Sequence, residues 1–351
     1  MSARIDFGRA TVRVRARAAG FTAMIGVRTV IVCLALVALA LLIAVLALGS
    51  GDAPIPPDRV LRAIFVGDQR FDRLVVWEWR FPRVLLALVL GAALGVSGAI
   101  LQSVTRNPLG SPDIVGFGTG AYTGALIVML VLGGGEFRTA AGALVGGLAA
   151  AVAIQLLALR HNVSGFRLIL VGIGVSAMLA SINAWLVLRA DLLSAMGAAA
   201  WGMGSLSGLT WAQVMPAMAL LTVSSLAVIS LAARLRMLEL GDDLASAVGI
   251  PVRRTRLQLI FLSVALTAVA TAVTGPIAFI ALAAPQLARR LARTPSTALV
   301  PAAAMGALLL ITSDWLAQRL FAPTTLPVGV VTVSIGGLYL AYVLVAEAKR
   351  S

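Results

Sequence analysis

Long uncharged, apolar stretches dominate the chain and set its expected architecture. Eight runs carry no Asp, Glu, Lys or Arg, and a membrane-spanning helix needs about 20 such residues. These runs are Val84–Thr105, Ile114–Gly135, Thr139–Leu159, Leu168–Leu188, Leu192–Ala233, Leu257–Ala288, Thr294–Ser313 and Leu320–Ala346. The alternation of polar and apolar residues expected of a lipid-facing barrel strand is absent, so the runs predict helices.

Two of the runs are too long for a single span. The Leu192–Ala233 run predicts a loop or a short interfacial helix with Trp201 and Trp211, followed by a span near Gln213–Ala232. The Leu257–Ala288 run is broken at its Gly-Pro step, because proline interrupts the hydrogen-bond ladder of a helix, and so predicts two spans.

Together with a first apolar run at Thr29–Leu48, the pattern predicts an all-α, polytopic membrane protein with about ten spans. Two of these spans contain glycines at the spacing that lets helices approach closely. These glycines are Gly91, Gly95 and Gly98, then Gly142 and Gly146, and we expect them to serve helix packing.

Composition and charge agree with this class. The chain is 60% hydrophobic and only 12% charged, and its mean hydropathy is +1.00. A cytoplasmic N-terminus puts 19 of the 28 basic residues on the cytoplasmic side, as the positive-inside rule requires. We therefore expect a basic cytoplasmic arm at 1–28, a transmembrane domain at 29–346 and a cytoplasmic tail at 347–351. The net charge of +14 then signals orientation and attraction to anionic lipid, and we expect no nucleic-acid partner.

Few residues are available for catalysis or metal binding. One cysteine, Cys33, and one histidine, His161, exclude disulfides, thiolate metal sites and bis-histidine haem. A membrane enzyme or a haem protein is excluded for the same reason. No GxxxxGK[ST] phosphate loop is present, so the chain cannot be its own P-loop ATPase. We expect no catalytic residue, no metal ligand and no bound cofactor.

Ion-driven transport is the less favoured alternative. A proton- or sodium-driven carrier needs a charged residue inside the membrane. Asp314 is the one acid within a predicted span, and it lies near the outer end of that span. We expect Asp314 to pack or to lie at an interface rather than to carry protons. The pattern favours a transporter that takes its energy from a partner ATPase.

The loop at residues 237–256, between the sixth and seventh spans, has the pattern of a short capped helix. Asp242 or Asp243 can accept hydrogen bonds from the free N–H groups at its start. Leu244–Val248 form one apolar turn, and Gly249 ends it. Connections inside a compact membrane protein are usually short, so a structured loop of this length suggests a partner.

Motifs along the chain resemble those of the iron-siderophore and vitamin B12 permeases among ABC importers, the FecCD-type family. They are Arg80-Phe-Pro-Arg83, Gly91-Ala-Ala-Leu-Gly-Val-Ser-Gly98, Arg106-Asn-Pro-Leu-Gly-Ser-Pro-Asp113, Leu240-Gly-Asp-Asp-Leu-Ala-Ser-Ala-Val-Gly249, Gly275-Pro-Ile-Ala-Phe279, Ala284-Pro-Gln286 and Leu326-Pro-Val-Gly329. The resemblance runs from about Trp79 to the C-terminus. The sequence around Asn107 is most similar to the corresponding segment of permeases for catecholate siderophores of the enterobactin type.

The resemblance implies a type II ABC importer in a bacterial cytoplasmic membrane, with both termini cytoplasmic. In this family two ten-span permease subunits, identical or different, enclose a pathway. Two cytoplasmic ATPases, which bind ATP and Mg, grip the coupling loops, and a periplasmic or lipid-anchored binding protein delivers the cargo. The expected cargo is a ferric siderophore, with a catecholate as first choice. Cobalamin or haem is the alternative within the same family.

The resemblance also assigns functional residues. The ATPase-coupling residues are Leu240, Gly241, Asp242, Asp243, Leu244, Ala245 and Gly249. The residues implied for docking the binding protein are Arg80, Arg83 and Arg319, although the family's third basic position itself falls on Gln318. Polar or adaptable residues of the fifth span are expected to line the pathway, namely Ser176, Met178, Ser181 and Asn183. Helix packing remains an open alternative for these four.

The eighth span departs from the family pattern. Gln286 stands where the family usually has histidine, and Ala278 and Ala281 stand where it usually has glycine. Glutamine keeps a hydrogen-bonding side chain but cannot titrate, so we expect no pH-linked role at that position.

Overall fold

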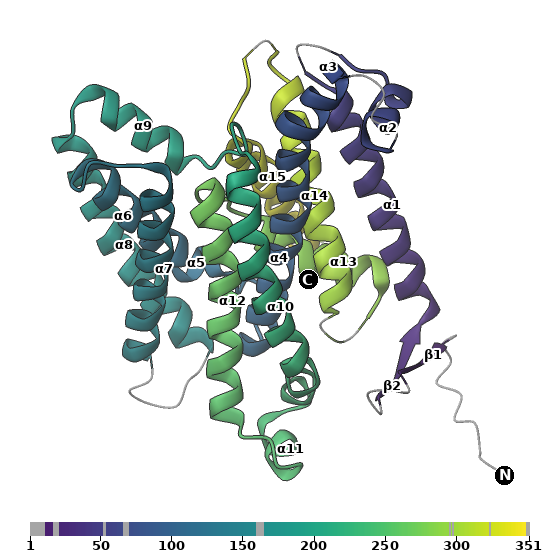
Figure 1. The fold of residues 1–351 in the computed structure, drawn as a ribbon. Helices are drawn as coiled ribbons and strands as arrows, with labels where there is room; N and C mark the ends of the chain where they lie inside the picture. The colour runs from purple at the N-terminus through teal and green to yellow at the C-terminus, as the bar shows by residue number, and fades with distance from the viewer. Residues whose placement is uncertain are drawn as a thin grey trace.

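The computed structural model describes residues 11–16, 21–51, 54–65, 70–158, 165–294, 296, 298–322 and 324–348. His161, much of the predicted N-terminal arm and the last three residues of the predicted tail lie outside these ranges. Figure 1 shows a bundle of roughly aligned helices that runs from one end of the molecule to the other.

Ten helices correspond to the ten predicted spans, eight of them with 21 residues or more, and the predicted all-α, polytopic architecture is confirmed. They are α1 (Val27–Gly49), α4 (Phe81–Thr105), α6 (Phe117–Leu130), α7 (Glu136–Ala158), α8 (Gly165–Arg189), α10 (Trp211–Glu239), α12 (Val252–Thr274), α13 (Ile280–Ala292), α14 (Leu299–Arg319) and α15 (Val328–Ala348). Among the described residues, seven helices are long and apolar enough to cross a membrane by themselves.

Short elements define the two ends of the bundle. At one end lie α2 (Pro57–Phe65), α3 (Arg70–Arg73), the π-helical turn η2 (Leu74–Arg80) and α9 (Leu192–Gly202). At the other lie α11 (Asp242–Ala247) and an antiparallel hairpin of β1 (Thr11–Ala16) and β2 (Phe21–Gly26). We call these the α9 end and the α11 end. The short helix predicted between the fifth and sixth spans is confirmed as α9, which contains Trp201, whereas Trp211 begins α10 instead. The hairpin was not predicted.

The helix α9 starts at a side-chain cap. The carboxylate of Asp191 accepts a hydrogen bond from the backbone N–H of Ser194 at 3.0 Å. This bond stabilises the charged form and lowers the pKa of Asp191 from its usual value.

Two spans are much shorter than their apolar runs predicted. The helices α6 and α13 have 14 and 13 residues. Gly116 alone separates α6 from the short helix α5 (Pro112–Val115), whereas α13 follows the non-helical residues 275–279. Gly116, directly before α6, has φ 97°, and Phe279, directly before α13, has φ 71°. This left-handed backbone cannot continue a right-handed helix, so the predicted boundaries at Ile114 and Pro276 are wrong by several residues. Irregular backbone at membrane depth is tolerated where it is buried or lines a cavity.

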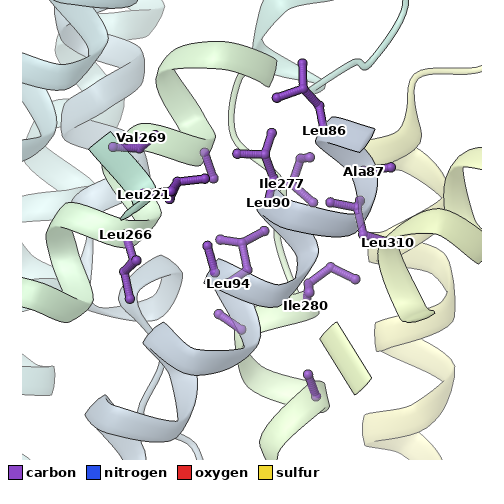
Figure 2. Close-up of a cluster of buried hydrophobic side chains, with 14 of the residues drawn as sticks. Leu86, Ala87, Leu90, Leu94, Leu221, Leu266, Val269, Ile277, Ile280 and Leu310 are labelled. Atoms are coloured by element: carbon purple, nitrogen blue, oxygen red, sulfur yellow. The ribbon is translucent and has the colours of Figure 1, made fainter. Parts of the chain in front are cut away.

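The helix α4 forms the centre of the core. Its residues Leu86, Leu90 and Leu94 are almost fully buried in a cluster of hydrophobic side chains that also includes residues of α10, α12 and α14 (Figure 2). Gly98 abuts the backbone carbonyl of Ala281 in α13, and Gly95 abuts that of Ala302 in α14, so a side chain at either position would overlap backbone. Glycine pairs between α6 and α7, including Gly124 with Gly142, pack in the same way. The predicted packing role of the glycines is confirmed.

Candidate functional site

The loop at residues 237–256, the predicted ATPase contact, contains a helix whose start differs from the prediction. The short helix α11 begins after Gly241, which has φ 122°, and no side chain caps it. The expectation that Asp242 or Asp243 caps the helix is therefore wrong. Gly249 has φ 80°, and its N–H donates to the carbonyl of Ser246 at 2.9 Å, so glycine ends the turn as predicted.

An apolar face of this loop is open to the surroundings. Leu240, Leu244 and Val248 are 62%, 60% and 65% exposed, whereas Ala245 is buried against the bundle. Leu244 and Val248 are about one turn apart, so they lie on one face of α11, and Leu240 precedes the break at Gly241. Exposed apolar side chains of this kind suit contact with another protein or with the membrane. We call these three residues the coupling patch.

Asp242 makes ion pairs with the bundle. Its Oδ1 lies 2.7 Å from Nη2 of Arg106, which follows α4, and 3.0 Å from Nη2 of Arg256 in α12. Asp243 is exposed on the same turn. Two arginines therefore explain why Asp242 does not cap its helix: its carboxylate joins α11 to two long helices.

At the α9 end, a cleft of about 390 Å³ brings the predicted docking arginines together. Arg80, Arg83 and Arg319 all line it, although Arg319 is far from the other two in sequence. Arg80 donates to the carbonyl of Leu48 at 2.8 Å, and Arg319 donates to Ser50 Oγ at 2.9 Å. We call this the arginine cleft; its positive charge suits an acidic partner.

Within the arginine cleft, Arg83 has a buried partner. Its Nη2 lies 2.8 Å from Oδ1 of Asp314, and its Nε donates to Oδ2 at 3.0 Å. The Asp314 side chain is fully buried and that of Arg83 is 18% exposed. Gln318 donates to the same carboxylate at 2.9 Å. The carboxylate of Asp314 is therefore saturated by two neighbours, which supports its predicted packing role.

A second hollow of about 660 Å³ opens beside α8, and we call it the α8 cavity. Of the four predicted pathway residues, Asn183 lines it. Ser176 and Ser181 instead donate to carbonyls one turn earlier in their own helix, and Met178 is exposed. The side chain of Asn183 is only 5% exposed, and its Oδ1 has no partner among the described residues.

Asp113 also lines the α8 cavity, and the sequence reasoning did not single it out as a pathway residue. It lies in the short helix α5 (Pro112–Val115), outside the predicted spans. One carboxylate oxygen accepts the backbone N–H of Phe279, and Oδ2 has no partner among the described residues. Asp113 of α5 and the non-helical segment before α13, which supplies Pro276 and Ala278, thus meet at the cavity wall. A Gly-Pro interruption within an apolar run was the sequence signal that pointed here.

The side chain of Gln286 forms a hydrogen bond, as its amide group led us to expect. Its Nε2 donates to the carbonyl of Pro108 at 2.7 Å, which links α13 to the segment between α4 and α5. Among the described residues, no group of three or more His, Cys, Asp or Glu side chains could hold a metal ion.

Comparison with a solved structure defines the class of protein. The chain superposes on a metal-chelate type ABC transporter in an inward-facing conformation with a TM-score of 0.80 and 26% identity, covering 90% of this chain and 99% of that chain. A helical bundle of about ten spans with an exposed coupling helix is therefore the permease subunit of an ABC transporter.

The sequence comparisons then give the family: residues 35–346 match the FecCD transport family, and the chain belongs to it. It is 48% identical over 323 residues to the ferric enterobactin transport system permease protein FepG of Escherichia coli (strain K12), covering 92% of this chain and 98% of the relative. It is 36% identical over 322 residues to the probable siderophore transport system permease protein YfhA of Bacillus subtilis (strain 168), covering 90% and 94%.

Proposed function

We propose that this chain is one half of a heterodimeric permease that imports ferric siderophores, with a catecholate of the enterobactin type as the first cargo. The observation that carries this choice is the 48% identity to a ferric enterobactin permease over 92% of the chain. Cobalamin or haem, which other permeases of the same family transport, is the second candidate cargo.

The two ends of the bundle receive different partners in this proposal. The α11 end faces the cytoplasm, where one of two ATPases, holding ATP and Mg, covers the coupling patch. The α9 end faces outward, where a binding protein docks at the arginine cleft. The distribution of basic residues along the chain supports this orientation. The α8 cavity is then one wall of the pathway, and the second permease subunit supplies the opposite wall.

ATP hydrolysis drives the cycle by alternating access. A ligand or nucleotide shifts an equilibrium between conformations only through its different interactions with them. The ATPases change shape between their nucleotide states, and α11 carries that change into the bundle. The short helices α6 and α13, with irregular backbone before them, are the elements of this wall best suited to move.

Deleting the gene in its source bacterium tests the cargo. Under iron limitation, cells without the chain are expected to lose growth on a catecholate siderophore and to regain it when the gene is restored. Growth and iron uptake are measured with a catecholate, a hydroxamate and haem as single iron sources, and cobalamin uptake is measured separately. A defect confined to haem or cobalamin would replace the siderophore as cargo.

A charge placed in the coupling patch is expected to prevent ATPase binding. Leu244→Asp leaves the bundle folded, because the native side chain is 60% exposed. An unpaired carboxylate in a dry apolar interface is costly, so the ATPase should no longer co-purify with the permease. Ser246→Asp is the matched control, since it adds the same charge at an exposed position of α11 outside the patch. Equal ATPase recovery with both variants would rule out the coupling patch as the contact.

Reversing one charge in the arginine cleft is expected to weaken docking of the binding protein. Arg319→Glu should reduce affinity roughly tenfold, because a like-charge contact with an acidic partner repels it, and the loss should shrink at high salt. Arg138→Glu makes the same charge change at the start of α7, outside the cleft. Affinities are compared by surface plasmon resonance in nanodiscs, and equal losses for the two variants would contradict docking at the cleft.

A further inference from the structure

The segment Arg106–Asp113 joins the coupling helix to the cavity wall, and we call it the strap. Its first residue pairs with Asp242 of α11 at 2.7 Å. Pro108, in the middle, accepts a hydrogen bond from Gln286 at 2.7 Å. Asp113, the last residue, accepts the N–H of Phe279 and lines the α8 cavity. One short stretch of chain therefore contacts α11, α13 and the cavity.

The strap is compact enough to move as a unit. The N–H of Gly110 donates to the carbonyl of Asn107 at 2.9 Å, and the side chain of Asn107 accepts the N–H of Leu109 at the same distance. A turn closed by both a backbone and a side-chain bond resists local deformation. The half of the strap next to Arg106 is therefore held in one shape.

The backbone of Arg106 indicates that this side chain is required for more than ending α4. Arg106 has φ 52°, the left-handed conformation in which helices usually end with glycine. A non-glycine residue there is strained, and such strain persists where the surroundings over-determine it and clusters at functional sites. Besides Asp242, the Arg106 side chain donates to the carbonyl of Leu238 at 3.3 Å.

Stability does not explain the Arg106–Asp242 pair. The two side chains are 52% and 42% exposed, and ion pairs with that much solvent contribute little to folding. Within α11, Asp242 is the residue whose side chain bonds to the neighbouring helices. The pair therefore fixes where α11 sits relative to the strap.

We propose that Arg106 is a positioning residue that transmits the movement of α11 through the strap to the wall of the α8 cavity. This inference rests on the proposed function, in which an ATPase moves α11. Without Arg106, the ATPase still binds the coupling patch and hydrolyses ATP, but α11 moves without carrying the strap. Uptake per ATP hydrolysed is the quantity that Arg106 controls.

Arg106→Gly separates coupling from folding. Glycine adopts the left-handed backbone without strain, so this variant should melt no lower than the native chain. Its uptake per ATP in proteoliposomes with the ATPase and binding protein should nevertheless fall roughly five- to tenfold, the scale of a modest coupling between sites. A control, Arg254→Ala, removes an exposed positive charge at the same end and should leave the ratio unchanged. If Arg106→Gly fails to fold, Arg106→Asn, which also tolerates this backbone, takes its place.

A charge exchange gives the second readout. Arg106→Asp places two acids together and should uncouple transport. Adding both Asp242→Arg and Arg256→Asp reverses all three charges, so that the central residue of the cluster again faces two opposite charges. This triple variant should recover most of the lost uptake per ATP. If Arg106→Gly takes up as much siderophore per ATP as the native chain, Arg106 is not a positioning residue. The same conclusion follows if the charge exchange recovers no uptake per ATP.

The same experiments distinguish this inference from the proposed function. Co-purification of the ATPase with Arg106→Gly, together with its loss from Leu244→Asp, means that α11 is the ATPase contact whatever the coupling ratio shows. Retention of the ATPase by Leu244→Asp refutes the proposed contact itself, and with it the inference that depends on α11 being moved.

Discussion

Replacing Asp314 with alanine is expected to lower the free energy of unfolding by about 3–5 kcal/mol, because Arg83 is left as an uncompensated charge in the bundle. The native pair is held by two arginine contacts, at 2.8 Å and 3.0 Å, and the Asp314 side chain is fully buried. The melting temperature of the detergent-purified chain, followed by tryptophan fluorescence, should fall by many degrees.

Two controls show whether the charge is responsible. Asp58→Ala breaks the pair of Asp58 with Arg62, whose side chains are 60% and 67% exposed, and should cost less than about 1 kcal/mol. The double change Arg83→Met with Asp314→Leu removes both charges and should recover much of the lost stability. If Asp314→Ala melts like Asp58→Ala, the buried pair does not hold α4 to α14.

Adding a single methyl group at Gly98 is expected to be the second strongly destabilising change. Gly98→Ala forces a Cβ into the backbone carbonyl of Ala281, so α4 and α13 must separate or bend. Overpacking a core costs about 1–3 kcal/mol, and a clash with backbone belongs at or above the upper end. The folded fraction after purification, measured by size-exclusion chromatography, should fall sharply.

The same glycine-to-alanine substitution at another position should raise the stability of the protein instead of lowering it. A Cβ at Gly174 in α8 meets no atom within 4 Å among the described residues. Gly174→Ala should therefore stabilise its helix by about 0.5–1 kcal/mol, since glycine is entropically costly in a helix interior. Equal melting temperatures for the two alanine variants would contradict the close approach of α4 and α13.

The spans could be predicted because each depends on a local property of the chain. A run of about 20 uncharged residues has no stable place in water, so the length and spacing of the runs predict the helices and their order. The position of α9 also follows locally, since an uncharged run too long for one span had to contain a turn. The glycines could be assigned to packing because small residues at helical spacing have few other uses in a membrane.

The two short spans could not be bounded in this way. Hydrophobicity does not report backbone conformation, and the left-handed residues Gly116 and Phe279 lie inside apolar runs. The Gly275-Pro276 break was visible in the sequence, but the three further non-helical residues, 277–279, were not.

Side-chain contacts between helices that are distant in the sequence could not be predicted either. Arg83 and Asp314 are 231 residues apart, and Arg106 and Asp242 are 136 apart. A single sequence carries no signal that pairs such residues, so Asp242 was assigned to its own helix end and Arg83 to an outside partner. For Asp242, two nearby arginines compete successfully with the helix N–H groups.

ATP-dependent accumulation of a radiolabelled ferric siderophore in proteoliposomes tests the proposed import most directly. The vesicles contain this chain, its partner permease subunit and the ATPase, with the binding protein on one side and ATP on the α11 side. Uptake that requires both ATP and the binding protein, and that Leu244→Asp abolishes while Ser246→Asp preserves it, is the expected result. Uptake that proceeds without ATP, or that Leu244→Asp leaves unchanged, would contradict import driven through α11.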